Sequence, residues 1–238
     1  MQDKESYVHN LFTRIAEKYD LLNDVMTASL HRSWKKTLVE HAAQALKGKS
    51  NARILDLCTG TGDIADIWIQ DGRVIEIIAI DSCAPMLESG YKKLKKKYQG
   101  DPPKLKMLEA DAMELLYPHE HFDAVTVSFG LRNVQDADKC LAEVYRVLKP
   151  GGYFACLDLG HPPIPFIDWL YKKIFLQIIP SIGASFAKDK DAYQYLVDSL
   201  NTWPPQWTLS EALYDFGFKR SYYKNIMLGT IALVVAEK

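Results

Sequence analysis

The chain has 238 residues, 48% of them hydrophobic and 25% charged, with a formal net charge of −1 at pH 7. These values are ordinary for one soluble globular domain and give no indication of nucleic-acid binding. The N-terminus lacks the charged-then-apolar pattern of a signal peptide, and no apolar run reaches the roughly 18–20 residues of a membrane span. Four cysteines are scattered without metal-ligand spacing, so we expect no disulfide, no zinc and a cytoplasmic protein.

Residues 5–47 are expected to be helical, because apolar side chains recur there at helical spacing. From residue 52 to about 159, strand-like and helix-like segments alternate. Strands are expected at 53–57, 75–80, 105–108, 122–128 and 153–159, and helices at 63–70, 84–98 and 136–148. Such alternation predicts a mostly parallel sheet covered by helices on both faces. A sharp turn is expected at 149–152, before the fifth strand.

After residue 160 this pattern stops, since prolines interrupt regular structure at 161–165. Residues 166–200 are apolar and aromatic, with helical spacing. Two late strands, at 219–227 and 229–236, are close enough in sequence to pair antiparallel at the sheet edge. We therefore expect one α/β domain over residues 1–238, with a seven-stranded sheet, an N-terminal helical cap at about 5–47 and a helical lid at about 162–203.

A glycine-rich turn, Thr59-Gly60-Thr61-Gly62, follows the first expected strand. A strand, a tight glycine turn and a helix start make the cradle of a nucleotide cofactor in open α/β sheets. The turn also fits a dinucleotide pattern, so an NAD-dependent oxidoreductase stays open as an alternative. However, Asp56, Asp63 and Asp66 crowd the turn, and residues 54–72 contain no Lys or Arg. This charge favours S-adenosylmethionine, which carries a sulfonium and an ammonium group and no phosphate.

Two more carboxylates stand at expected strand ends. Asp81 ends the second strand, where a carboxylate can accept hydrogen bonds from ribose hydroxyls. Asp111 follows the third strand, where it could accept from an adenine amino group. The alternative is that each aspartate only caps the helix after it. Three acidic strand ends together with the glycine turn favour the cofactor interpretation.

Three further segments carry a more specific pattern. They are Tyr19-Asp20-Leu21-Leu22-Asn23 with His31-Arg32-Ser33-Trp34, then Phe129-Gly130-Leu131-Arg132-Asn133-Val134, and Arg146-Val147-Leu148-Lys149-Pro150-Gly151-Gly152. With these motifs the chain resembles the ubiquinone/menaquinone biosynthesis C-methyltransferases over nearly its whole length. It departs from the family pattern at Thr27 and at Gly160, where serine is usual.

The resemblance implies the Rossmann-like fold of class I methyltransferases, a mostly parallel sheet finished by an antiparallel hairpin, with S-adenosylmethionine as methyl donor. The expected cofactor-binding residues are Asp56, Thr59, Gly60, Thr61, Gly62, Asp81, Ser82, Met86, Asp111, Ala112, Ser128 and Tyr19. The alternative role of Tyr19 is core packing, and Asp20 is expected to cap or pair structurally.

The implied reaction is methylation of a ring carbon in a prenylated quinol, demethylmenaquinol or the benzoquinol of the ubiquinone pathway. Deprotonation of a ring hydroxyl gives a phenolate, which calls for a base and a stabilising cation and needs no metal. His31 is the candidate base, because imidazole titrates near neutrality; a structural hydrogen bond is its alternative role. Arg132 is expected to stabilise the oxyanion, or else to form an ion pair that closes its loop. Asn133 could orient a water molecule or the ring oxygen.

The apolar segment at 166–180 has two interpretations that are compatible with each other. It packs as an ordinary lid helix, or it forms a hydrophobic wall or membrane-facing surface for a prenylated substrate, with Lys172 and Lys173 near anionic head groups. The expected partners are thus a lipophilic quinol and a peripheral membrane contact, and no nucleic acid; a homodimer stays open. Two more alternatives remain: a methyltransferase acting on another small phenolic compound, and a non-catalytic interaction protein of this fold.

Overall fold

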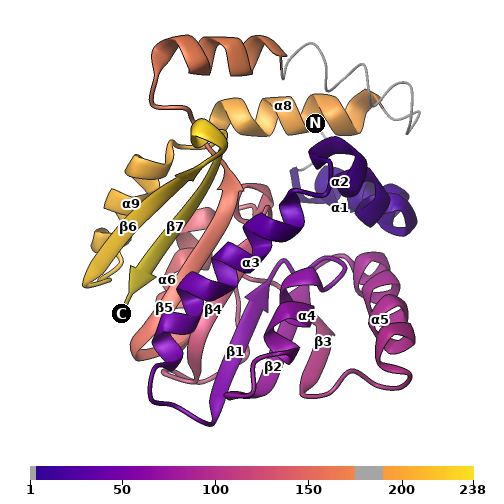
Figure 1. Ribbon diagram of the computed structural model, residues 1–238, viewed down its shortest axis with the longest axis vertical. Coiled ribbons are helices and arrows are strands. Elements are labelled where there is room, and N and C mark those ends of the chain that lie inside the picture. Colours follow the sequence, from indigo (N-terminus) through magenta and orange to yellow (C-terminus); the bar gives the residue numbers. More distant parts are fainter. Residues whose placement is uncertain (1–3, 175–189) are drawn as a thin grey trace.

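The computed structural model describes residues 4–174 and 190–238. Its centre is a seven-stranded sheet in the order β3-β2-β1-β4-β5-β7-β6 (Figure 1). The strands are β1 (Ala52–Leu57), β2 (Val74–Asp81), β3 (Leu105–Glu109), β4 (Phe122–Ser128), β5 (Leu148–Leu159), β6 (Arg220–Ile226) and β7 (Ile231–Glu237). Strands β1 to β5 run parallel, and β7 is antiparallel to both of its neighbours. The expected seven-stranded, mostly parallel sheet is confirmed.

Helices cover both faces of this sheet. They are α1 (Lys4–Ile15), α2 (Tyr19–Thr27), α3 (His31–Ala42), α4 (Asp63–Ile69), α5 (Ala84–Tyr98), α6 (Ala137–Val147), a helix over residues 165–174, α8 (Lys190–Thr202) and α9 (Gln206–Asp215). Short 3-10 helices include η3 (Leu131–Asn133) and η4 (Met227–Gly229). Among the described helices, none has the length and apolar character needed to cross a bilayer.

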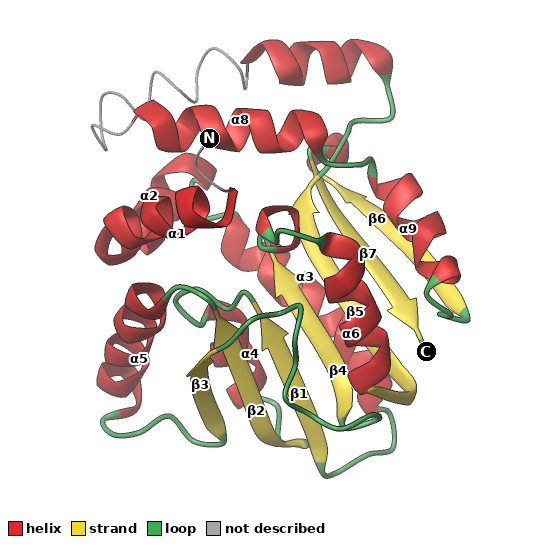
Figure 2. Cartoon of the chain, turned by 180° about the vertical axis from the view of Figure 1, so that it is seen from behind, coloured by secondary structure: helices red, strands yellow, loops and turns green. Residues whose placement is uncertain are grey.

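The alternation of side chains along each strand divides the core in two. Ile54 and Trp68 belong to the layer that α3 and α4 bury against one face of the sheet. Leu55, Leu57 and Leu141 belong to the layer under α6 and α9 on the other face. Figures 1 and 2 show these two layers from opposite sides. Successive residues of a strand point to opposite faces, so β1 is apolar on both.

The strand order reverses between β1 and β4. In open α/β sheets, ligands bind outside the carboxyl ends of the strands at such a reversal. Here α1, α2 and α8 lie over those ends (Figure 1). The fold therefore places α1, α2 and α8 above the expected cofactor turn.

Several expected elements need correction. Strand β5 begins at Leu148, so the predicted sharp turn at 149–152 is a bulge within the strand, where Gly151 has φ +72°. The two late strands do pair antiparallel at one end of the sheet, as expected, with β6 outermost and β7 between β6 and β5. Helix α9 was not predicted, although Leu209 and Leu213 have helical spacing and are buried. Of the expected apolar segment at 166–180, residues 175–180 lie outside the described residues.

Candidate functional site

The loops that leave β1 and β4 meet at the reversal of strand order. Cys58 (φ +50°) and Phe129 (φ +57°) both adopt the left-handed backbone conformation that side chains disfavour. A Cβ atom on Gly130 would stand 2.3 Å from the Cβ of Cys58. Residue 130 must therefore be glycine for the two loops to approach this closely.

The glycine turn is fixed by its own geometry and by Asp81. Gly60 (φ +56°) and Gly62 (φ +80°) adopt the left-handed conformation that glycine tolerates. The backbone N–H of Gly60 donates to Asp81 Oδ2 at 2.8 Å, and that of Cys83 donates to Asp81 Oδ1 at 2.9 Å. Burial raises the pKa of Asp81. Each carboxylate oxygen keeps a lone pair with which it can accept from a ligand hydroxyl.

A small cavity of about 60 Å³ lies beside this turn. It brings together four expected cofactor residues, Asp81, Ser82, Asp111 and Ala112. Apolar side chains, Ile80 among them, supply further walls, and Asp111 Oδ1 accepts from the backbone N–H of Met113 at 2.8 Å. Carboxylates beside an apolar slot are suited to a ribose and an adenine, so these residues fit the nucleoside half of S-adenosylmethionine.

Asp56 lies below the turn instead of facing a ligand. Its side chain is buried and accepts hydrogen bonds from Thr59 Oγ1 at 2.5 Å and from Thr126 Oγ1 at 2.8 Å. It lines neither this small cavity nor the larger one described below. Burial raises the pKa of Asp56 to about 7, although both hydroxyl hydrogen bonds lower it. Asp56 and Thr59 therefore hold the turn in place.

The charge argument from the sequence was wrong in part. Asp63 pairs with Lys35 and Lys93, each at 2.7 Å, and Asp66 pairs with Lys97 at 2.5 Å. Burial opposes ionisation of Asp63, but the two lysines hold its pKa well below the ordinary value. Cations that are remote in the sequence thus balance the carboxylates of the turn.

A polar network joins the N-terminal helices to the turn. Thr61 Oγ1 donates to Asp20 Oδ1 at 2.6 Å, and Lys93 bridges Asp20 Oδ2 at 2.8 Å and Asp63. Asp20 therefore pairs structurally, as expected. A Cβ atom on Gly90 would stand 2.7 Å from the backbone of Thr61, so α5 packs directly on the turn.

Several expected cofactor residues line neither cavity: Thr59, Gly60, Thr61, Gly62, Met86 and Ser128. Met86 is buried with Ala16 and Cys83 beneath the turn. Ser128 ends β4, and its buried Oγ has no hydrogen-bond partner among the described residues. This hydroxyl lies at the carboxyl end of a central strand, and the cofactor role expected of Ser128 stays a prediction.

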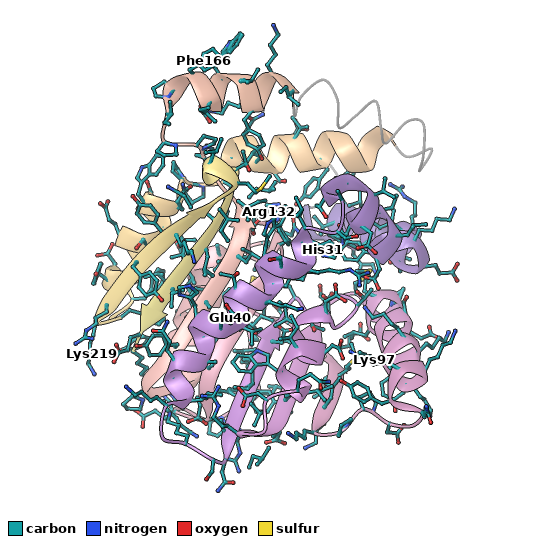
Figure 3. The ribbon with its side chains drawn as sticks, viewed as in Figure 1. His31, Glu40, Lys97, Arg132, Phe166 and Lys219 are labelled. Atoms are coloured by element: carbon teal, nitrogen blue, oxygen red, sulfur yellow. The ribbon has the colours of Figure 1, made fainter. Side chains whose placement is uncertain are left out.

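A second, larger cavity of about 530 Å³ adjoins the first, with Asn133 in the lining of both. Tyr19, His31, Arg132 and Asn133 line it together with many apolar side chains, including Phe12, Met26, Trp34, Phe129, Leu159 and Ile231. The labelled side chains of His31 and Arg132 lie near the centre of the molecule, below α8 (Figure 3). The three expected catalytic residues therefore share one apolar cavity, and Tyr19 lines it too.

Arg132 serves the structural role expected as its alternative and also lines the cavity. Its Nη1 pairs with Asp158 Oδ1 and donates to the backbone oxygen of Phe129 at 3.0 Å. Arg132 is 9% exposed and Asp158 is 3% exposed. Burial raises the pKa of Asp158, and the Arg132 guanidinium opposes this. The pair fixes a permanent cation at the cavity wall.

Asn133 lines both cavities. Its Nδ2 donates to the backbone oxygen of Phe129 at 3.2 Å, and its Oδ1 accepts from the Tyr195 hydroxyl at 3.1 Å. The residue next to Arg132 thus marks the point where the acidic and the apolar cavities meet.

His31 begins α3 and is 3% exposed. Its Nε2 lies 3.0 Å from Asp24 Oδ1, while Nδ1 is buried without a hydrogen-bond partner among the described residues. Burial lowers the pKa of His31, and the bond with Asp24 opposes this. The lowered pKa favours the neutral imidazole, the form that a base requires.

The two departures from the family motifs have structural accounts. Thr27 Oγ1 donates to the backbone oxygen of Asn23 at 2.7 Å and accepts from the His31 N–H at 3.4 Å, as a serine hydroxyl could. A Cβ atom on Gly160 would stand 2.5 Å from the backbone oxygen of Gly229. A serine there requires η4 to move.

Asp24, Asp158 and Tyr195 were not among the expected site residues. Each contacts an expected catalytic side chain, His31, Arg132 or Asn133 respectively. A signal existed for two of them, since Asp24 directly follows the motif that ends at Asn23, and Asp158 is the acidic residue after the third motif.

The chain matches the model of the ubiE/COQ5 methyltransferase family over residues 1–238. It is 36% identical to "Ubiquinone/menaquinone biosynthesis C-methyltransferase UbiE" of Paracoccus denitrificans (strain Pd 1222), over 98% of this chain and 90% of that protein. It is 38% identical to the protein of the same name from Francisella tularensis subsp. mediasiatica (strain FSC147), over 100% of this chain and 93% of that protein.

Among solved structures, the chain is similar to a "SAM-dependent methyltransferase, possible histamine N-methyltransferase" from Thermotoga maritima, with TM-score 0.59, 18% identity and 96% and 99% of the two chains covered. The expected class I methyltransferase fold is confirmed by this likeness and by the sheet order. The expected S-adenosylmethionine chemistry and quinone-ring C-methylation are confirmed at the level of the family. The NAD-dependent and non-catalytic alternatives are not supported. Membrane contact and a homodimer stay predictions.

Proposed function

This chain belongs to the ubiE/COQ5 methyltransferase family, and from that premise we propose that it transfers the methyl group of S-adenosylmethionine to a ring carbon of a prenylated quinol. Its substrates would be demethylmenaquinol, the demethylated benzoquinol of the ubiquinone pathway, or both. Relatives whose names state these pathways span nearly the full chain and support the proposal.

The meeting of the two cavities at Asn133, beside Arg132, is the observation that carries the proposal. The small cavity offers carboxylates to a nucleoside, and the large one offers apolar walls to a quinol ring and the start of its prenyl chain. A ring seated against Arg132 would lie next to the opening of the cofactor cavity.

The residues that would hold the cofactor line the two cavities, except for Ser128, which ends β4 outside the lining of both. Asp81 would accept from the ribose hydroxyls and Asp111 from the adenine amino group, with Ser82 and Ala112 as neighbouring walls. Ser128 and Tyr19 would face the methionine half, where the bound cofactor supplies an electrophilic methyl group.

The substrate must become electron-rich before it can accept a methyl group. In this proposal the imidazole of His31 takes the proton of a ring hydroxyl, and the charge that develops on the oxygen is stabilised by the Arg132 guanidinium. Asp158 keeps that guanidinium in place, and Asn133 orients the ring oxygen or a water. The apolar walls exclude bulk water, which strengthens these interactions.

We also propose that the protein binds a membrane surface around the mouth of the large cavity. Val25, Leu30 and Met227 line this cavity and are exposed. On the helix over residues 165–174, Phe166 is 66% exposed and Trp169 55%, and Phe166 points away from the body of the molecule (Figure 3). Lys173 Nζ lies 5.0 Å from the centre of the Trp169 ring, a pairing suited to the interface of anionic lipid.

The N-terminal helices and the segment before α9 take the roles of cap and lid in this proposal, within one methyltransferase domain. Both contribute to the large cavity, the first through Tyr19 and His31 and the second through Tyr171 and Tyr195.

The quinone pool of cells that lack this protein tests the function. Mass spectrometry should show a demethylated quinone in place of the methylated one, and the gene should restore the methylated species. A pool unchanged by the deletion would contradict the proposal. The demethylated species that accumulates identifies the natural acceptor.

A further inference from the structure

Asp24 is held rigidly although it is partly exposed. The Arg32 guanidinium donates hydrogen bonds to both carboxylate oxygens, from Nε to Oδ1 at 2.9 Å and from Nη2 to Oδ2 at 2.6 Å. The hydrogen bonds from Arg32 and His31 hold the pKa of Asp24 well below its usual range. Asp24 is therefore a carboxylate at any pH near neutrality.

An ionised carboxylate can only accept hydrogen bonds. The contact between His31 Nε2 and Asp24 Oδ1, at 3.0 Å, therefore requires that Nε2 carries the ring proton. In a neutral imidazole the other nitrogen, Nδ1, then has a free lone pair. Nδ1 is buried, has no hydrogen-bond partner among the described residues, and belongs to a side chain that lines the large cavity.

We propose that Asp24 is a positioning residue that fixes the Nε2–H tautomer of His31, so that Nδ1 is the atom that accepts the substrate proton. The proposal deepens the function above and rests on it. The substrate O–H bond breaks, its electron pair stays on the ring oxygen, and the proton forms a bond with Nδ1. Arg32 takes no part in this proton transfer. Its exposed side chain holds the Asp24 carboxylate in position through two hydrogen bonds.

The charged groups around His31 are consistent with this role. Asp24 on α2 and Asp63 on α4 favour its protonated form, while Lys35 on α3 opposes it. Burial outweighs them and lowers the pKa of His31. The base is thus neutral before the substrate arrives, and Asp24 stabilises the imidazolium that forms once the proton is taken up.

The tautomer can be observed without any activity. Two-bond ¹H–¹⁵N spectra of the histidine-labelled full chain, with His31 assigned by its loss in His31→Gln, should show the Nε2–H form. In Asp24→Asn the amide can donate to Nε2, so the signal should change to the Nδ1–H form or to a mixture. A wild-type His31 in the Nδ1–H form contradicts the proposal.

Methyl transfer supplies the second measurement. Asp24→Asn should lower kcat by about 10²–10⁴-fold, the range for losing a positioned base or its tautomer, while the KM for S-adenosylmethionine stays within about twofold. The acidic limb of the kcat/KM profile should move to lower pH, because Asp24 no longer raises the pKa of His31. Asp24→Glu should restore part of kcat.

Glu40→Gln is the matched control, since it also exchanges a carboxylate for an amide, at an exposed position of α3 outside both cavities. It should leave the tautomer, kcat and pH profile unchanged. If Asp24→Asn matches Glu40→Gln in these three readouts, the proposal is wrong. If the wild type methylates no quinol, the proposed function fails instead, and the spectra still decide the tautomer.

Discussion

At the scale of single residues, the site depends on charged side chains that the protein has taken out of water. Arg132 and Asp158 form a buried ion pair, so the removal of one charge destabilises the other in the protein interior. Asp56 is buried under the glycine turn with two hydroxyl donors. Both features have measurable consequences for stability, and those consequences can be separated from catalysis.

The pair of Arg132 and Asp158 can be tested with a double variant. Asp158→Leu alone should lower the free energy of unfolding by about 3–5 kcal/mol, because it removes the carboxylate that neutralises a buried guanidinium. Adding Arg132→Met should restore most of this loss, since apolar side chains of similar volume replace the pair. Methyl transfer should be absent in the double variant, because the Arg132 guanidinium is lost. Recovery of turnover together with stability would show that Arg132 has only a structural role.

The burial of Asp56 predicts how the free energy of unfolding depends on pH. Because burial raises its pKa from 3.8 to about 7, the folded state binds a proton that the unfolded chain releases above about pH 4. The stability this carboxyl contributes is present below pH 4 and lost as pH rises to about 7. Relative to Asp56→Asn, the wild type should lose about 4 kcal/mol over this range, at 1.36 kcal/mol per pKa unit. Urea unfolding at pH 4, 5.5 and 7 measures the difference, and parallel curves for the two proteins would contradict the buried, protonated carboxyl.

At the scale of elements, the helices over the sheet are tied to the cofactor turn by polar contacts. Asp20 on α2 holds both Thr61 in the turn and Lys93 on α5. Cofactor binding and the order of α2 should therefore be coupled.

Asp20→Asn should weaken the binding of S-adenosylmethionine by about tenfold, equivalent to the loss of one or two hydrogen bonds. The free energy of unfolding should change by less than about 1 kcal/mol, because the ion pair is partly exposed. Titration calorimetry measures the affinity. Asp101→Asn, which breaks an exposed pair between Lys95 and Asp101, serves as the control. Equal affinities in the two variants would rule out the coupling.

The sequence predicted elements well where the pattern was local. The glycine turn and the positions of Asp81 and Asp111 at strand ends were predicted because strand ends and turns are contiguous in the chain. Pairing across elements could not be seen: Lys35, Lys93 and Lys97 balance the turn from α3 and α5. The inward orientation of Asp56 was predictable in principle, since it shares a face of β1 with Ile54, which is fully buried.

At the scale of the whole molecule, Val25, Leu30 and Met227 are exposed where they line the large cavity, and Phe166 and Trp169 are exposed on the helix over residues 165–174. Phe166→Ser with Trp169→Ser should weaken binding to anionic vesicles by at least about tenfold, given roughly 1.5–3 kcal/mol for burying one large side chain. The KM for a long-chain quinol in vesicles should rise, and that for a short-chain analogue should not. Leu116→Ser, at a 95% exposed position between β3 and β4, is the control. Unchanged vesicle binding in the double variant would contradict the membrane surface.

The central claim is that the acidic and apolar cavities together perform C-methylation of a quinol ring. It is tested most directly by incubating the purified chain with S-adenosylmethionine that carries a ¹³C-labelled methyl group and, in separate reactions, with demethylmenaquinol and with the demethylated benzoquinol of the ubiquinone pathway. The label is then located by NMR. The account predicts a labelled methyl group on the ring carbon, formed by the wild type and by Glu40→Gln and lost in Arg132→Met. A label on a ring oxygen, or the absence of label from both quinols, would contradict it.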